Sequence, residues 1–168
     1  MDIRNAVAVV SGANRGLGRH FAAELLARGA AKVYAGARNP DQVDLPGVTP
    51  LQLDITDPES VAAAAAVATD VTLLINNAGK AAEWALTNAL RLELAPRGIT
   101  TTALHVGYMD TDMAAHVDAP KNDPAKIAAM ALDALAEGAP EVVADEISRN
   151  VRSGLSAELP VLYPQLAG

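Results

Sequence analysis

The sequence predicts an α/β fold in which a doubly wound parallel sheet carries helices on both faces. Short apolar runs alternate with amphipathic helical patterns along the chain, which is typical of successive βαβ units. A glycine-rich segment, Ser-Gly-Ala-Asn-Arg-Gly-Leu-Gly at residues 11–18, lies between the first apolar run and the first helical pattern. The 168 residues suffice for a single domain over residues 1–168, because no linker or repeat divides them.

The first half of the chain contains four predicted strands and two predicted helices. Residues 6–10 form a short buried strand, and Leu17, Phe21 and Leu25 share one face of the helix that follows. Gly29 is expected to adopt the left-handed cap of that helix. Further strands are predicted at residues 32–37, 48–53 and 71–75, and an alanine-rich helix at residues 61–69, opened by a capping box at residues 56–59.

The second half continues the same alternation. A helix is predicted from about residue 80 to residue 95, because Pro96 and Gly98 end it. After it we expect a strand at residues 99–106, a helix from Asp123-Pro124 to Gly138, and a last short strand at residues 141–144.

The composition excludes several classes of protein. Without cysteine, the chain has no disulfides or thiolate metal sites, and no histidines or carboxylates show metal-ligand spacing, so no metal site is expected. The longest uncharged apolar stretch, residues 61–68, is too short to span a bilayer. A net charge of −7 argues against nucleic-acid binding. We therefore expect a soluble cytoplasmic protein that binds neither nucleic acid nor membrane.

The glycine-rich segment predicts a phosphate-binding turn. Without side chains at three positions the backbone turns tightly, so that its N–H groups approach a pyrophosphate at the positive end of the new helix. The spacing is G-x-x-x-G-x-G, and its place between a strand and a helix favours a dinucleotide site. The residues assigned to this site are Ser11, Gly12, Asn14, Arg15, Gly16, Leu17 and Gly18.

Four separated motifs resemble those of the short-chain dehydrogenase/reductase family. They are residues 11–18, Asp54 at the end of the third strand, Asn-Asn-Ala-Gly at residues 76–79, and the turn at residues 107–111. In addition, residues 80–99 are similar to the family's helix that carries the active-site lysine. The resemblance covers nearly the whole chain, and it implies a Rossmann-like fold and an oxidoreductase that interconverts a small carbonyl compound and an alcohol.

The chain departs from the family after its Asn-Asn-Ala-Gly motif. There the family has a helix, a strand with a catalytic serine, and a Y-x-x-x-K tyrosine, whereas here Gly79 is followed directly by Lys80 and the residue four before Lys80 is Asn76. We expect one helix–strand unit fewer, an internal deletion that compromises the family's usual interface in any homo-oligomer, for which Trp84 is a candidate contact. A natural miniature, an engineered excision and an incompletely recorded chain all remain open. Ser11 also stands where threonine is usual.

Two arginines favour NADP(H) over NAD(H). The end of the second predicted strand carries Arg38 and no carboxylate, and Arg15 lies in the glycine-rich segment. Guanidinium groups bind a 2′-phosphate bidentately, whereas an acidic residue at this place would hold the ribose hydroxyls of NAD. The alternative is that both arginines are ordinary solvated surface charges.

The resemblance implies further contacts to the coenzyme. It places Asp54 and Ile55 beside the adenine, although Asp54 is alternatively a turn or helix-start residue before Thr56. It also assigns Asn77, Ala78 and Gly79 to the segment beside the ribose, and Gly107 and Thr111 to the turn that holds the nicotinamide amide.

Lys80 is the member of the family's catalytic trio that the sequence retains. The resemblance implies that Lys80 binds the nicotinamide ribose and lowers the pKa of the tyrosine; alternatively it is a helix-start lysine in solvent. Tyr108 is the best substitute phenol, or else it lines the substrate pocket. We therefore expect an NADP(H)-dependent oxidoreductase with impaired turnover. The alternative is a non-catalytic NADP(H)-binding module that serves as a sensor, a scaffold or a minimised variant.

Overall fold

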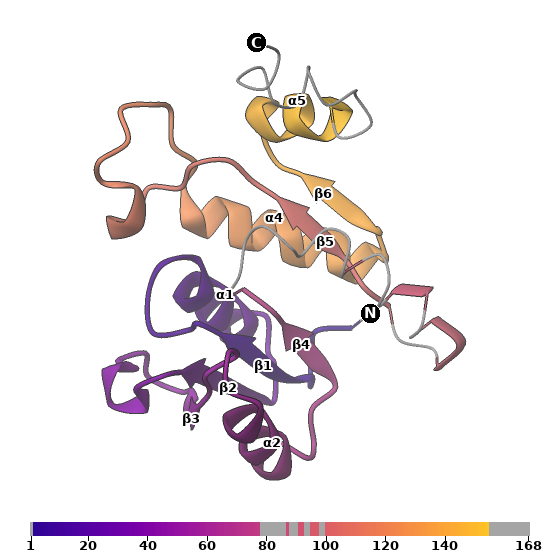
Figure 1. Ribbon diagram of the computed structural model, residues 1–168. Helices are drawn as coiled ribbons and strands as arrows, with labels where there is room; N and C mark the ends of the chain where they lie inside the picture. The colour runs from indigo at the N-terminus through magenta and orange to yellow at the C-terminus, as the bar shows by residue number, and fades with distance from the viewer. Residues whose placement is uncertain (1, 78–86, 88–90, 93–94, 98–99, 155–168) are drawn as a thin grey trace.

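A four-stranded parallel sheet forms the first half of the protein. The computed structural model describes residues 2–77, 87, 91–92, 95–97 and 100–154 (Figure 1). In the first sheet the strand order is β3-β2-β1-β4, and all three pairings are parallel. The strands are β1 Val7–Ser11, β2 Lys32–Ala37, β3 Thr49–Gln52 and β4 Leu73–Ile75. Pro50 lies in β3, an edge strand, where the missing N–H of proline is tolerated.

Helices cover both faces of this sheet, which confirms the predicted α/β fold. On one face, α1 (Gly16–Ala27) packs beside α4 (Pro124–Glu137), and together with β1 and β2 they enclose the main apolar core (Figure 1). On the opposite face, Ala64 of α2 (Pro58–Val67) packs with Val9, Tyr34 and Leu51 of the sheet.

The remaining described strands form a second, two-stranded parallel sheet. It consists of β5 (Ala103–His105) and β6 (Glu141–Val143), and within the described residues no ladder joins β5 to β4. The sequence predicts a single sheet with one strand fewer than the family has. The described strands instead form two separate sheets. Within the described residues β5 is paired with β6, and β4 with β1. The helix α4 packs on both α1 and β6, so it connects the second sheet to the first half of the protein.

The helix ends follow local capping chemistry. Gly29 and Gly138 have φ angles of 84° and 76°, as expected for left-handed residues after α1 and α4. The predicted capping box before α2 is wrong, because Asp57 is the N-cap, its side chain accepts from the N–H of Glu59, and the helix begins at Pro58. The sequence analysis missed α5 (Glu146–Gly154). Short 3₁₀ helices lie at Pro40–Gln42, Ala95–Arg97 and Asp112–Ala114.

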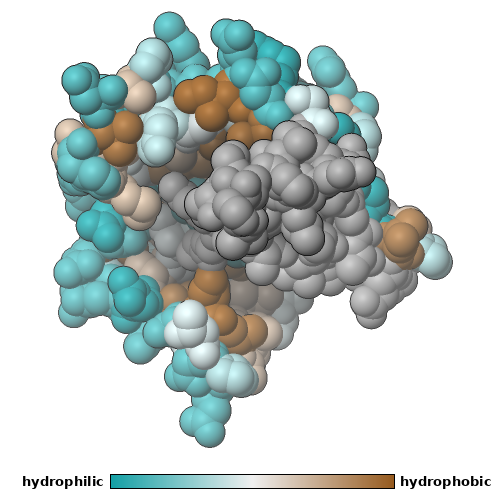
Figure 2. All heavy atoms as spheres, turned by 45° about the horizontal axis from the view of Figure 1, so that its top comes forward, coloured by the Kyte–Doolittle hydropathy of each residue, from teal (hydrophilic) through white to brown (hydrophobic). Residues whose placement is uncertain are grey.

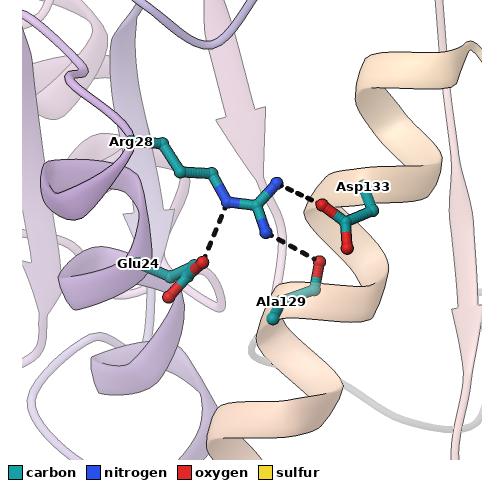
Figure 3. A network of polar contacts seen from close by, with 4 residues as sticks. All are labelled: Glu24, Arg28, Ala129 and Asp133. Atoms are coloured by element: carbon teal, nitrogen blue, oxygen red, sulfur yellow. Dashed lines mark hydrogen bonds and ion pairs between the residues drawn. The ribbon is translucent and has the colours of Figure 1, made fainter.

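Arg28, the residue after α1, connects α1 to α4 (Figure 3). Its Nε donates to Glu24 at 2.9 Å, its Nη1 to Asp133 at 2.6 Å, and its Nη2 to the carbonyl oxygen of Ala129 at 3.2 Å. Burial disfavours the charge of Arg28, but these carboxylates raise its pKa above the ordinary value. The guanidinium therefore joins the two helices that pack on the same face of the sheet.

Two further observations bear on the sequence predictions. Most of the helix predicted at residues 80–95 lies outside the described residues. No helix in the described part of the chain is long and apolar enough to cross a membrane.

Candidate functional site

The carboxyl ends of the four parallel strands of the first sheet lie along one edge, which is where open α/β sheets bind ligands. Ser11 ends β1, and the glycine-rich segment connects it to Gly16, where α1 begins. Gly12 and Gly16 have φ angles of 65° and 55°, which favour glycine. The N–H of Ala13 donates to the carbonyl oxygen of Gly36 in β2 at 2.9 Å, so the turn is fixed to the neighbouring strand.

Gly18 is required by close packing rather than by its φ angle. A Cβ atom at this position would lie 2.2 Å from the carbonyl oxygen of Gly12 and 2.8 Å from Nδ2 of Asn77. A side chain here would therefore push the first turn of α1 away from the turn that precedes it. The glycine lets the helix start lie directly against this backbone.

The N-terminus of α1 has no side-chain cap. Its N-cap residue is Arg15, whose side chain makes no capping hydrogen bond, and the first turn holds no acidic residue. By contrast, Asp57 and Asp123 cap α2 and α4 with their carboxylates. The first N–H groups of α1 consequently lie at the strand ends without a carboxylate, which is the arrangement that binds an anionic group.

A buried hydroxyl joins the ends of β1 and β4. Ser11 is only 2% exposed, and its Oγ donates to Oδ1 of Asn76 at 3.0 Å and accepts from the N–H of Asn77 at 2.8 Å. Nδ2 of Asn77 also donates to the carbonyl oxygen of Ser11 at 3.3 Å. Ser11 and Asn77, both predicted site residues, are thus brought together beside the glycine-rich turn.

The turn at residues 107–111 lies beside the glycine-rich turn. The Cγ2 atom of Thr111 lies 3.7 Å from the position that a Cβ of Gly16 would take. Tyr108 follows Gly107 and is 47% exposed. The fold therefore brings together two predicted segments that are far apart in the sequence.

The charged and apolar residues predicted at the adenosine end lie on the surface. Arg15 and Arg38 are exposed, and Ile55 is 42% exposed. Asp54 makes the turn contacts that were its alternative role, because its Oδ1 accepts from the N–H of Thr56 at 3.0 Å and from its hydroxyl at 2.7 Å. These hydrogen bonds, and more weakly the charge of Arg38, lower the pKa of Asp54 below its ordinary value.

Four of the predicted residues lie outside the described part of the chain. They are Ala78, Gly79 and Lys80, and the interface candidate Trp84.

His105 has a structural role. It was predicted to be a packed residue at a strand end, and it is the last residue of β5, where its Nε2 lies 3.0 Å from Oε1 of Glu141. Among the residues that the structure describes, no three histidine, aspartate or glutamate side chains are grouped so that they would hold a metal ion.

The sequence analysis missed two residues that contact the turn at residues 107–111. They are Asp145 and Asn122. The carboxylate of Asp145 accepts from the N–H of Gly107 at 2.7 Å and from Nδ2 of Asn122 at 2.6 Å. One signal for Asp145 was present in the sequence: it caps α5 by accepting from the N–H of Ser148, as an N-cap aspartate does. No sequence signal pointed to Asn122.

The fold and the glycine-rich turn define a dinucleotide-binding protein of the Rossmann class, and comparison with known proteins supports this. A sequence model of the NAD(P)H-binding family matches residues 12–138, so the chain belongs to that family. A solved short chain dehydrogenase from Burkholderia cenocepacia J2315, in complex with NADP, is 29% identical with a TM-score of 0.82, and the match covers 100% of both chains.

A second solved structure has the same fold, and a second protein is similar in sequence. The hydroxysteroid dehydrogenase of Escherichia coli has the same fold, with a TM-score of 0.70 at 19% identity over 83% of this chain and 95% of that one. The short chain dehydrogenase tazN of Aspergillus terreus is 32% identical over 100 residues. That match covers 51% of this chain and 22% of the relative, so it spans only about a fifth of the relative's length. The protein is a member of the short-chain dehydrogenase/reductase family, as the motifs predicted.

Proposed function

We propose that this protein binds NADP(H) and is an oxidoreductase that interconverts a small carbonyl compound and an alcohol. The observation that carries the proposal is the uncapped N-terminus of α1, next to a turn in which a Cβ at Gly18 would collide with Gly12. This geometry suits the diphosphate of a dinucleotide, which accepts hydrogen bonds from N–H groups and is favoured by the helix dipole.

The preference for NADP(H) over NAD(H) is supported by the position of Arg38. It directly follows Ala37, the last residue of β2, and its side chain is exposed. Arg15 is also exposed at the start of α1. In our proposal the two guanidinium groups bind the 2′-phosphate, and Ile55 packs against the adenine ring. The solved short chain dehydrogenase from Burkholderia cenocepacia holds NADP, which agrees with this assignment.

The remaining predicted residues are assigned to the nicotinamide half of the coenzyme. The nicotinamide supplies or accepts the hydride when it is bound. In the proposal Asn77 borders the ribose with Ala78 and Gly79, Lys80 binds the nicotinamide ribose, and the turn from Gly107 to Thr111 holds the nicotinamide amide. The small residues of this set permit close approach of the backbone to the coenzyme.

The sequence lacks the residues that transfer the proton in the family's reaction. The sequence passes from Gly79 directly to Lys80, with no Y-x-x-x-K tyrosine before it and no preceding serine strand. Losing positioned proton transfer costs roughly a hundredfold to ten-thousandfold in rate. We therefore propose that turnover by this chain is impaired, and that Tyr108 does not replace the lost tyrosine.

An NADPH titration followed by a turnover assay tests the proposal. Binding is measured from the fluorescence of NADPH on protein whose intact mass agrees with 17.3 kDa. Oxidation is then followed by the absorbance of NADPH with a panel of aldehydes and ketones. Saturable binding with slow oxidation of at least one compound is the expected result. Failure to bind either NADPH or NADH contradicts the proposal entirely.

The second candidate function is a non-catalytic NADP(H)-binding module. It is favoured by the absence of the serine and tyrosine motifs from the sequence, since the coenzyme turn itself needs neither. The same assay separates the two candidates. Tight NADPH binding with no oxidation across the panel supports the module and rejects the enzyme.

A further inference from the structure

We propose that Asp145 is a positioning residue for the nicotinamide end of the coenzyme site. Its carboxylate holds the turn at residues 107–111 against the glycine-rich turn, so that Gly107 and Thr111 lie where the nicotinamide amide binds. This inference rests on the proposed function, because it concerns how the same coenzyme is bound.

Both carboxylate oxygens of Asp145 accept hydrogen bonds, and those to Oδ2 come from residues that are distant in sequence. Oδ2 accepts from the backbone N–H of Gly107 at 2.7 Å and from Nδ2 of Asn122 at 2.6 Å. Oδ1 accepts from the N–H of Ser148 at 2.7 Å, in the first turn of α5. The carboxylate thus connects the segment after β6 to the segment after β5.

Gly107 permits this approach because it has no side chain. A Cβ atom there would lie 3.1 Å and 3.4 Å from the two carboxylate oxygens of Asp145. The first of these distances is shorter than nearly all contacts made by real Cβ atoms. Any other residue at position 107 would displace the carboxylate or the turn by a few tenths of an ångström.

Asn122 extends the connection to both ends of the intervening loop. Its Nδ2 and its backbone N–H both donate to the carbonyl oxygen of Tyr108, at 3.1 Å and 2.8 Å. Its own carbonyl oxygen accepts from the N–H of Asp110 at 2.9 Å, and the bridge between Met109 and Asn122 closes the loop. Thr111 follows directly, with its methyl group next to Gly16.

The arrangement requires a carboxylate rather than an amide. Three N–H donors converge on Asp145, and an ionised carboxylate only accepts hydrogen bonds. In Asp145→Asn, one oxygen becomes an NH₂ group that faces a donor. Burial alone would raise the pKa of Asp145, but the hydrogen bonds from Ser148, Gly107 and Asn122 lower it below its ordinary value, so the group is ionised at neutral pH.

The experiment compares two probes on the wild-type protein and on Asp145→Asn. NADPH reports on the whole site through its Kd and through the change in nicotinamide fluorescence on binding. Adenosine 2′,5′-bisphosphate, which lacks the nicotinamide, reports on the adenosine end alone. Asp118→Asn is the matched control, because it removes the same charge from an exposed position of the 109–122 loop.

We expect Asp145→Asn to raise the Kd of NADPH about tenfold and to abolish the fluorescence change. The Kd of the bisphosphate should stay within about twofold of the wild-type value, and Asp118→Asn should match the wild type for both probes. If Asp145→Asn does not fold, Asn122→Ala removes a partner of Asp145 that has no proposed contact with the coenzyme, and it should give the same pattern.

Three results would overturn the inference. Equal weakening of both probes would mean that Asp145 only maintains the fold, and unchanged NADPH binding and fluorescence would mean that it does not position the turn. The third such result is wild-type protein that binds the bisphosphate as tightly as NADPH, because the nicotinamide end would then make no contact to be positioned. By contrast, wild-type protein that binds neither probe would reject the proposed function itself.

Discussion

The hydroxyl of Ser11 accepts a hydrogen bond of 2.8 Å from the backbone N–H of Asn77, and this joins the carboxyl ends of β1 and β4. Removing a buried hydroxyl leaves its partners unsatisfied, so Ser11→Ala should lower the free energy of unfolding by about 2 kcal/mol. Urea unfolding measures this change. Ser11→Thr retains the hydroxyl and should lose far less, and equal losses in the two variants would show that the hydrogen bonds do not matter.

Gly18→Ala should destroy coenzyme binding, because its Cβ would lie 2.2 Å from the carbonyl oxygen of Gly12. The start of α1 must move, and its N–H groups then no longer converge on the diphosphate. NADPH titration should show a loss of at least about a hundredfold in affinity.

Gly138→Ala is the control for that substitution. Gly138 has a φ angle of 76° but no atom within 4 Å of its Cβ position, and it lies after α4. The left-handed strain should lower the free energy of unfolding by about 1 kcal/mol and leave the Kd of NADPH unchanged. Similar affinities for the Gly18 and Gly138 variants would contradict the assignment of the glycine-rich turn.

Arg38→Asp should weaken the binding of NADPH at least about tenfold more than that of NADH, because it replaces a phosphate-binding cation by an anion. The two Kd values are measured by fluorescence titration at the same ionic strength. Arg4→Asp, at an exposed position before the amino end of β1, makes the same charge change at the opposite edge of the sheet and should alter neither value. An equal effect of Arg38→Asp on both coenzymes would reject the role of Arg38.

Arg28 and Asp133 should contribute unequally to stability although they share one ion pair. The side chain of Arg28 is 23% exposed and has three partners, whereas that of Asp133 is 63% exposed (Figure 3). Arg28→Met should therefore lower the free energy of unfolding by about 2 kcal/mol, and Asp133→Asn by less than about 1 kcal/mol. Chemical denaturation of both variants tests this, and a larger loss for Asp133→Asn would contradict it.

The contribution of Asp145 to stability should vanish in acid. Its pKa in the folded protein is below the ordinary value, so the ionised carboxylate stabilises the fold at pH values above the unfolded pKa of about 4. This stabilisation is lost as the pH falls through the folded pKa. At pH 7, Asp145→Asn should cost about 2 kcal/mol, and the difference from the wild type should shrink steadily below about pH 4. A difference that does not change with pH would show that ionisation of Asp145 is irrelevant.

The sequence predicted most of the fold because its apolar runs and caps are local signals. The strand predicted at residues 32–37 agrees with β2 residue for residue, and Asp123 and Gly138 bound α4 as expected. The strand predicted at residues 99–106 is shorter, since β5 covers only Ala103–His105, where its backbone pairs with β6. Periodicity alone does not report where a pairing partner ends.

The glycine-rich turn was predictable for the same reason, whereas the connection through Asp145 was not. Gly12, Gly16 and Gly18 act within one short segment, and their spacing reveals the turn. The contact between Asp145 and Gly107 joins residues that meet only after β5 and β6 have paired. The division of the strands into two sheets likewise depends on helix packing, which residue patterns within single elements do not encode.

Figure 2 shows one face of the molecule, on which groups of apolar residues lie among mostly hydrophilic ones. The strands of the described chain do not form one continuous ladder. Because no strand pairing joins β4 to β5 in the described chain, what couples the two halves is side-chain packing, mostly between α1 and α4, together with the contacts of Arg28 to Asp133 and Ala129. Packing of this kind loosens without breaking a strand pairing. The amide protons of β5 and β6 should thus exchange with solvent in a separate event from those of β1 and β2, and α4 is the element through which the halves unfold together or apart.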